Sequence, residues 1–284
     1  MILKVEKAFS LTWGLLRGQR RLASCPADNF GDRLSPFIAS RLSGRKVFCE
    51  YDKNKFPYFG GRLIGLGSIL EKVASDGDTV WGAGARGIDW FSTIKRLDVK
   101  AVRGPLTRAA ILKKNLECPE VYGDPAILIP YLFRIPLRKI YKIGIIPHFN
   151  DQSKYAGFPA KDVKIIDVKA DPLQVLRDIC DCEVILSSAL HGIIVAEAYG
   201  IPTCWLWPDA AAGPQWKETF FKYEDYYLST SRDPFYYAHR GEIDLDQAVK
   251  RAWDSKRPQS NPQKLLEAFP YLRKDIRGLD DLLR

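Results

Sequence analysis

Short apolar runs alternate with amphipathic segments along most of the chain. The run EVIL (183–186), for example, precedes a segment with helical spacing of its apolar residues, and several other runs end in glycine-containing turns. Apolar runs of this length, separated by helical patterns, are typical of parallel strands covered by helices on both faces. The pattern predicts strands within 46–51, 78–84, 99–104, 141–149, 163–168, 182–188 and 202–207, and helices at 34–44, 105–115, 171–180 and 192–200.

Capping signals support two of these helices. Pro105 stands at the first position of one helix, where no amide hydrogen is needed, and Asp171 precedes Pro172 in the same way at another. The tail from 261 onward is helical in pattern with a break near Pro270, and its apolar residues predict docking on a domain.

A proline-containing basic stretch at 131–139 divides the chain into two α/β halves. We expect domains at 1–137 and 138–284, with the C-terminal tail returning to the first domain. Ligands of open α/β sheets bind at the carboxyl ends of the strands. The turns that follow the strands are therefore where candidate chemistry is expected.

Composition supports a globular protein with anionic partners. Of 284 residues, 46% are hydrophobic and 27% charged, and no apolar run reaches the roughly 18 residues of a membrane-spanning helix. The start of the chain lacks the layout of a signal peptide, so we expect a soluble, cytoplasmic protein. The net charge of +9 suits phosphates, acidic glycans or an anionic membrane face; without a nucleic-acid-binding motif, we expect no nucleic acid partner.

Six scattered cysteines include no C-x-x-C pair, which indicates reduced thiols and no zinc site. The loop WGAGARG (81–87) has the spacing G-x-G-x-x-G of a dinucleotide site. The next strand, however, ends at Arg103 where such a site needs a carboxylate. We expect this loop, with Gly84 and Arg86, to bring the backbone close to a different ligand.

Arg103 and Arg108, in VRGPLTR (102–108), are candidates for binding an anion. A guanidinium at a strand end, beside the free amides of a helix start, suits a phosphate or carboxylate. The alternatives are an internal salt bridge for Arg103 and a solvent-facing position for Arg108. In DNFGD (28–32), Asn29 and Asp32 would either face a ligand or cap the next helix.

His191 lies where a buried strand turns into a helix, within SSALHGIIVAEAYGIP (187–202). An imidazole at the carboxyl edge of a sheet can act as acid or base near neutral pH, whereas a lone histidine in a core only packs. His148 is expected on the same cleft rim, and His239 in a structural loop. Ser188 has no G-x-S-x-G context of a serine nucleophile.

Taken together, these motifs resemble the polysaccharide pyruvyl transferase family. The matching segments cover residues 28 to 230, and VRGPLTR with LHGIIVAEAYGIP is the most specific pair. The resemblance implies two Rossmann-like domains in a GT-B-like arrangement, with the active site between them. It also implies transfer of a pyruvyl group from phosphoenolpyruvate to a sugar of a bacterial surface polysaccharide, forming a ketal without cofactor or metal.

By this resemblance, His191 stands at the phosphoenolpyruvate site and Arg103 binds the donor. Some members carry an arginine at the position of Ala189, and here Arg108, Arg86 or Lys222 would supply that charge. We expect His191, His148 and Asp32 to be catalytic. The expected donor-binding residues are Arg103, Arg108, Gly84, Arg86, Ser188 and Leu190, and the expected acceptor-binding residues are Asn29, Asp32, Trp207 and Lys222.

The aromatic segment 204–227 suits a sugar acceptor, because Trp205, Trp207 and Trp216 could stack on pyranose rings or pack in a core. The positive charge fits a lipid-linked acceptor at the cytoplasmic face of the inner membrane. Two alternatives remain open: a GT-B glycosyltransferase that binds a nucleotide ribose through Glu197, and a non-catalytic polyanion-binding protein of polysaccharide assembly.

Overall fold

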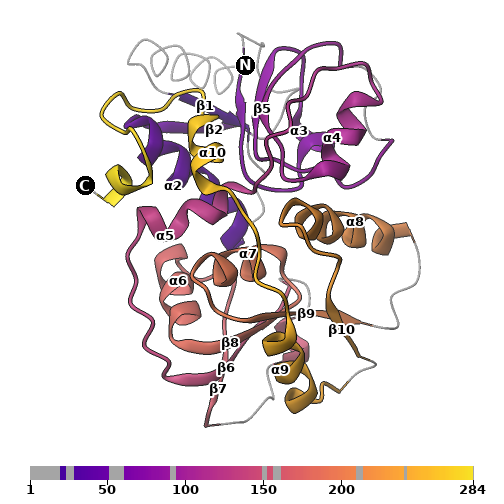
Figure 1. Ribbon diagram of the computed structural model, residues 1–284, viewed down its shortest axis with the longest axis vertical. Coiled ribbons are helices and arrows are strands. Elements are labelled where there is room, and N and C mark those ends of the chain that lie inside the picture. Colours follow the sequence, from indigo (N-terminus) through magenta and orange to yellow (C-terminus); the bar gives the residue numbers. More distant parts are fainter. Residues whose placement is uncertain are drawn as a thin grey trace, which may run out of the picture.

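Two five-stranded parallel sheets form the framework of the protein (Figure 1). The computed structural model describes residues 20–23, 29–50, 61–89, 94–148, 152–155, 161–208, 214–239 and 242–283. The first sheet has the order β2-β1-β3-β4-β5 and the second the order β10-β9-β8-β6-β7. Every pairing in both sheets is parallel, which confirms the predicted α/β class.

The strands are short and follow the apolar runs of the sequence. The first sheet contains β1 (Arg20–Ala23), β2 (Val47–Glu50), β3 (Leu63–Ile64), β4 (Asp78–Trp81) and β5 (Leu97–Ala101). The second contains β6 (Tyr141–Ile146), β7 (Val163–Ile165), β8 (Cys182–Ser187), β9 (Thr203–Pro208) and β10 (Tyr236–His239). The loop prediction for His239 was therefore wrong, because this residue ends an edge strand.

Helices cover both sheets. Those that follow strands of the first sheet are α2 (Phe30–Ser43), α3 (Leu70–Val73) and α4 (Pro105–Leu112), with the 3-10 turn η1 (Pro125–Leu128) and α5 (Ile129–Leu132) after them. The second sheet carries η2 (Gln152–Tyr155), α6 (Pro172–Cys180), α7 (Leu190–Ala198), α8 (Pro214–Ser229) and α9 (Leu245–Asp254). The tail adds α10 (Pro262–Glu267) and η3 (Leu279–Leu283).

Local sequence signals explain where several helices begin and end. The side chains of Asn29 and Asp171 accept hydrogen bonds from first-turn amides of α2 and α6. Gly44 ends α2 in the left-handed conformation, with φ of 64°, which a glycine adopts without strain. Helix α7 begins at Leu190, two residues earlier than predicted, so His191 lies inside its first turn.

The C-terminal tail packs against elements of the first sheet, as Figure 1 shows for α10. The indole nitrogen of Trp81 donates to the carbonyl of Leu265 at 2.8 Å, and Trp81 meets Phe269 edge-on at 4.6 Å between ring centroids. The amide of Arg273 donates to the carbonyl of Leu42 at 3.0 Å. One buried apolar cluster thus joins α2, α7, α8 and α10, so the two sheets share a core.

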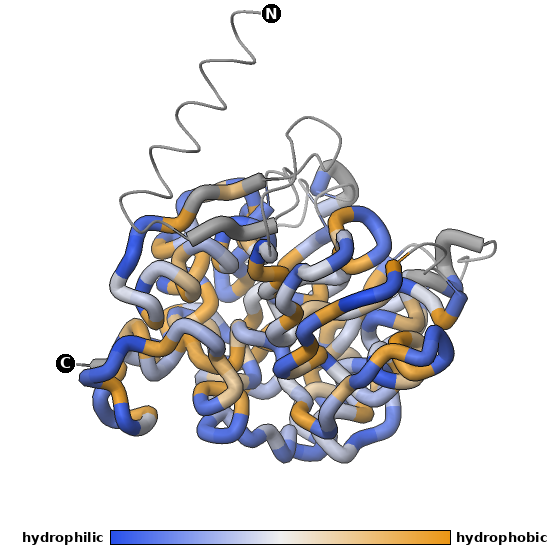
Figure 2. Tube along the Cα trace, turned by 90° about the horizontal axis from the view of Figure 1, so that it is seen from above, coloured by the Kyte–Doolittle hydropathy of each residue, from blue (hydrophilic) through white to orange (hydrophobic). Residues whose placement is uncertain are grey.

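The segment 131–139, predicted as a linker, has no regular structure after α5. Its Arg138 forms a bidentate ion pair with Asp181 of the second half, at 2.7 and 2.6 Å. Hydrophilic segments lie at the rim of the molecule in Figure 2. Within the described ranges, no helix has the length and apolar character needed to cross a bilayer.

Candidate functional site

A cavity of about 270 Å³ lies between the two halves of the chain. Residues at the start of α2, in and near α3 and in the loop after β4 form one wall, and residues after β6 and β8 form the opposite wall with one residue of α8. The lining consists of Asn29, Phe30, Gly31, Asp32, Ser68, Ile69, Lys72, Arg86, His148, Val168, Ala189, Leu190, His191, Gly192 and Lys222.

His191 enters this cavity from the first turn of α7. Strand β8 ends at Ser187, whose hydroxyl accepts the amide of Ala189 at 3.0 Å and so fixes the turn into the helix. The ring is 17% exposed and lies directly on the backbone of Gly31. A Cβ added at Gly31 would overlap Nδ1 of the ring and come within 2.6 Å of the ring carbon Cγ. On the other side, Nε2 lies 3.6 Å from Oδ2 of Asp124.

Asp32 is the carboxylate on the opposite wall of the cavity. It accepts a hydrogen bond from the Asn29 amide at 2.7 Å, while its own backbone amide donates to the Asn29 side chain at 3.1 Å. Burial raises the pKa of Asp32, and the charges of His191, Lys72 and Lys222 offset part of this effect. Asn29 therefore caps the helix and holds Asp32 at the cavity at the same time.

Three cationic side chains reach the cavity: Lys72 of α3, Arg86 of the glycine loop and Lys222 of α8. Burial, together with the nearby charges of Arg86 and Arg103, lowers the pKa of Lys222 to about 8. Asp32 is the one carboxylate that opposes this shift. Positive charge is thus in excess around the cavity, which favours binding of an anion.

Arg103 is fully buried behind the glycine loop rather than exposed in the cavity. Its Nε donates to Asp225 at 3.1 Å, one terminal nitrogen donates to the Ala85 carbonyl at 2.9 Å, and the other contacts the Ser68 hydroxyl. Gly84 makes room for the guanidinium, because any side chain there would overlap it. The internal salt bridge considered from the sequence is therefore the observed arrangement of Arg103.

Arg108 and Trp207 do not line the cavity. Arg108 donates to the Cys118 carbonyl at 3.1 Å and pairs with Glu120 at 3.3 Å. Trp207 packs edge-on against the buried Trp205, with ring centroids 5.0 Å apart, and Trp205 stacks on Tyr223 at 3.9 Å. The side chain of Trp216 lies outside the described residues.

The other predicted donor-side residues meet at the carboxyl end of β8. The Ser188 hydroxyl accepts the amide of His148 at 2.9 Å, which ties the ends of β6 and β8 together. The Ser188 carbonyl accepts the hydroxyl of Tyr223 at 2.8 Å, so α8 is anchored beside this turn. Leu190 is buried at the base of the cavity.

Sequence comparisons identify a family for the part of the chain that holds about half of this site, including His191. The family model described as polysaccharide pyruvyl transferase matches residues 80–210. Residues 80–210 are thus similar to the polysaccharide pyruvyl transferase domain. The predicted resemblance is therefore confirmed, and the matched range includes Arg86, Arg103, Asp124 and His191.

Two curated relatives match this chain over only part of their own length. Succinoglycan biosynthesis protein ExoV of Rhizobium meliloti is 32% identical over 188 residues, which cover 61% of this chain and 54% of that protein. An uncharacterized protein of Acanthamoeba polyphaga mimivirus is 30% identical over 192 residues, or 63% of each chain. The chain thus spans 54% and 63% of the lengths of these relatives.

Among solved structures, a functionally uncharacterized protein of Klebsiella pneumoniae aligns with a TM-score of 0.40 and 15% identity. The alignment covers 75% of this chain and 93% of that chain.

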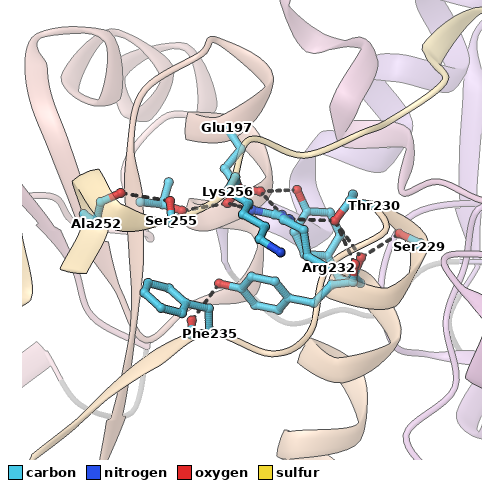
Figure 3. Close-up of polar contacts among 11 residues, drawn as sticks. Glu197, Ser229, Thr230, Arg232, Phe235, Ala252, Ser255 and Lys256 are labelled. Atoms are coloured by element: carbon cyan, nitrogen blue, oxygen red, sulfur yellow. Dashed lines mark hydrogen bonds and ion pairs between the residues drawn. The ribbon is translucent and has the colours of Figure 1, made fainter.

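Glu197, at the C-terminal end of α7 within the matched range, is enclosed in an internal network (Figure 3). Arg232 donates to both of its carboxylate oxygens at 2.9 and 2.7 Å. The hydroxyls of Tyr226 and Thr203 donate to the same oxygens at 2.6 and 2.8 Å. With its oxygens engaged in this way, Glu197 is not available to a nucleotide ribose.

Sequence reasoning missed Lys72. For Asp124, in the turn YGDPAIL (122–128), the sequence favours a structural role over the alternative of anchoring the cleft wall. Lys72 belongs to a four-residue helix, too short for a recognisable period, and is not part of any of the matched motifs. The turn YGDPAIL did single out Asp124, but its proximity to His191 depends on packing between the two halves.

No group of three potential metal-ligating side chains occurs within the described ranges. Cys118, Cys180, Cys182 and Cys204 are free, buried thiols, and burial raises the pKa of each to about 12. Thiols of this kind are poor nucleophiles at neutral pH. Cys25 lies outside the described residues.

Proposed function

We propose that this chain transfers a pyruvyl group from phosphoenolpyruvate to a sugar of a bacterial surface polysaccharide or its lipid-linked precursor, forming a ketal. The family match supports the reaction class, and the relative named for succinoglycan biosynthesis supports the polysaccharide setting. The observation that carries the proposal is the cavity itself. It combines an imidazole, a carboxylate and three cationic side chains.

Phosphoenolpyruvate carries a carboxylate and a phosphate, so its site needs several cationic donors. Lys72, Arg86 and Lys222 are placed to fill this role, and Lys222 or Arg86 would replace the arginine that some family members carry at the position of Ala189. Arg103 would contribute by holding the glycine loop in place, because its own nitrogens have partners within the protein. Arg108 does not line the cavity, so it would contribute to donor binding only indirectly.

The reaction needs one proton delivered and two removed. His191 would protonate the methylene carbon of phosphoenolpyruvate, which makes the central carbon electrophilic. One sugar hydroxyl then adds to this carbon and loses its proton, and phosphate leaves when a second hydroxyl closes the ketal. Asp32 is suited to accept a hydroxyl proton because burial raises its pKa, and His148 lies on the same rim.

The same proposal assigns a GT-B-like arrangement to the two parallel sheets, with the cavity between them as the active site. It also places the protein at the cytoplasmic face of the inner membrane, where a lipid-linked acceptor would be available. The net charge of +9 favours such an anionic surface.

A nucleotide-sugar transferase is less well supported, because the carboxylate considered for its ribose, Glu197, is bound to Arg232. A non-catalytic polyanion-binding protein would use the cationic side chains but would have no need of His191 in the cavity. The assay of phosphate release described next distinguishes these two alternatives from the proposed activity.

Phosphate release from phosphoenolpyruvate, with a lipid-linked oligosaccharide extract as acceptor, tests the proposal. We expect acceptor-dependent release by the wild type and a rate lower by about 10²–10⁴ in His191→Ala, the usual scale for a general acid–base group. His239→Ala is the matched control, since His239 lies in β10 and does not line the cavity.

Release that survives in His191→Ala would remove the histidine from the chemistry. If the wild type neither releases phosphate nor binds phosphoenolpyruvate in calorimetric titration, the donor is wrong. Binding of a nucleotide sugar in the same titration would then favour the glycosyltransferase.

A further inference from the structure

Asp124 uses only one of its two carboxylate oxygens to hold the backbone. It precedes η1, and its Oδ1 accepts the amide of Ala126 at 3.0 Å, as a capping residue does. The residue is completely buried. Its second oxygen, Oδ2, is buried without a hydrogen-bond partner within the described structure.

The nearest candidate partner of this oxygen is the ring of His191. Nε2 of His191 lies 3.6 Å from Oδ2, and it too is buried without a hydrogen-bond partner. A polar group left without a hydrogen bond in a protein interior destabilises the fold, and more so when the group is charged. A movement of a few tenths of an ångström would join the two atoms in one hydrogen bond.

We propose that Asp124 is the positioning residue of His191: it accepts a hydrogen bond from Nε2–H and thereby turns Nδ1 to the cavity as the reacting nitrogen. This inference rests on the proposed function in assigning the reaction. Its structural part, the choice of tautomer, does not depend on which substrate is bound.

Contacts on the other face of the ring support this arrangement. Gly31 holds the imidazole from the side of α2, so the ring is confined between the backbone of Gly31 and the Asp124 carboxylate. Asp32 is the second carboxylate whose charge acts on the ring, from the cavity wall. Nε2 is a fully buried atom, whereas Nδ1 lies beside the backbone of Gly31, which itself lines the cavity. Nδ1, at this edge of the cavity, is therefore the nitrogen left to exchange a proton with a ligand.

With Nε2 held by Asp124, each proton of the reaction has a donor and an acceptor. The imidazolium carries protons on both nitrogens, gives the one on Nδ1 to the methylene carbon of the donor and becomes neutral. The remaining proton stays on Nε2, held by the Asp124 carboxylate. The proton of one sugar hydroxyl, passed to Nδ1, restores the imidazolium for the next cycle. The proton of the other hydroxyl is accepted by Asp32 and leaves with the departing phosphate as hydrogen phosphate, when the bond from the central carbon to the phosphate oxygen breaks.

Asp124→Asn tests the pair, because asparagine keeps the oxygen that caps η1 and removes the charge. The matched control is Asp171→Asn, another Asp-Pro capping pair, at the start of α6. We expect kcat to fall by at least about 10², towards the 10⁴ known for replacing the orienting aspartate of a catalytic triad. KM for phosphoenolpyruvate should stay within about threefold, and the control should keep both constants.

Imidazole ¹⁵N NMR gives a readout that does not require activity. Only three histidines are present, so the spectrum of His191→Gln assigns the signals of His191. At a pH where the ring is neutral, we expect the proton on Nε2 in the wild type and a mixed or reversed tautomer in Asp124→Asn. A merely structural aspartate would lower stability without changing the tautomer.

A wild-type proton on Nδ1, or unchanged kcat and tautomer in Asp124→Asn, would overturn the inference. If Asp124→Asn does not fold, Asp124→Ser keeps a capping oxygen without the charge, and the wild-type spectrum alone still decides. An inactive wild type with Nε2 protonated would refute the proposed function and leave the pair intact.

Discussion

Lys222 is the residue whose charge state responds most directly to its surroundings in the cavity. Burial and the positive charges of Arg86 and Arg103 lower its pKa to about 8, against an ordinary value near 10.5. The ammonium form is therefore dominant below pH 8 and is lost above it. A bound dianion would favour the charged form, so affinity and protonation of Lys222 are coupled.

We predict that binding of phosphoenolpyruvate weakens by up to about tenfold between pH 7 and pH 9. A phosphate monoester is already dianionic in this range, since its second pKa is near 6. The loss therefore reports the lysine, whose charged fraction falls about tenfold per pH unit above its pKa. Calorimetric titration of wild type and Lys222→Arg measures the effect.

Arginine stays charged throughout this range, so Lys222→Arg should bind with a flat pH dependence. Parallel curves for the two proteins would assign the pH dependence to another group.

At the scale of single elements, the start of α2 has more than a capping role. The sequence predicted this helix from 34 onward, after a turn, whereas it begins at Phe30. Its second residue, Gly31, faces the ring of His191 from the opposite half of the molecule. This close approach of backbone to imidazole requires the absence of a side chain.

Gly31→Ala is expected to lower kcat by about 10- to 100-fold, because a displacement of the ring by an ångström is costly for catalysis. The new Cβ would lie 2.6–2.7 Å from two ring carbons of His191, closer than carbon atoms pack. In a helix, alanine is normally more stable than glycine by about 0.5–1 kcal/mol. Because the new Cβ would collide with His191, we expect thermal unfolding to show no such gain in stability.

Steady-state kinetics of Gly278→Ala provide the control, since a Cβ there meets no atom closer than 3.6 Å. If Gly31→Ala and Gly278→Ala have the same kcat, the contact between Gly31 and His191 does not contribute to catalysis.

At the scale of the whole molecule, α8 joins the two halves. Asp225 of this helix accepts hydrogen bonds from Arg103 at 3.1 Å and from the amide and hydroxyl of Thr107 at 2.9 and 2.6 Å. All three residues are completely buried. The same helix brings Lys222 to the cavity, so the structural link and the site depend on one element.

Asp225→Ala should lower the free energy of unfolding by about 3–5 kcal/mol, because it leaves the Arg103 guanidinium buried without its carboxylate. Urea unfolding followed by circular dichroism measures this change. Asp233→Ala, at an exposed position four residues after the end of α8, should stay within about 0.5 kcal/mol of wild type. Equal midpoints for the two variants would show that the pair contributes little.

Much of the framework could be predicted from the sequence, because the signals are local. Apolar runs gave most of the strands, and Asn29, Pro105 and Asp171 stand at the starts of helices. Shorter or edge elements such as α3 and β10 were missed, since four residues show no clear period.

For the site, the sequence by itself indicated the similarity to the polysaccharide pyruvyl transferase family. It also brought out six residues that all line one cavity: His191, His148, Asp32, Asn29, Arg86 and Lys222. Only the tertiary structure decided that Arg103 is buried against Asp225, that Arg108 and Trp207 lie elsewhere, and that Asp124 faces His191. The physical reason is sequence distance: Arg103 and Asp225 are 122 positions apart. Local patterns specify helices and strands, but pairing of side chains so far apart depends on how the two sheets pack.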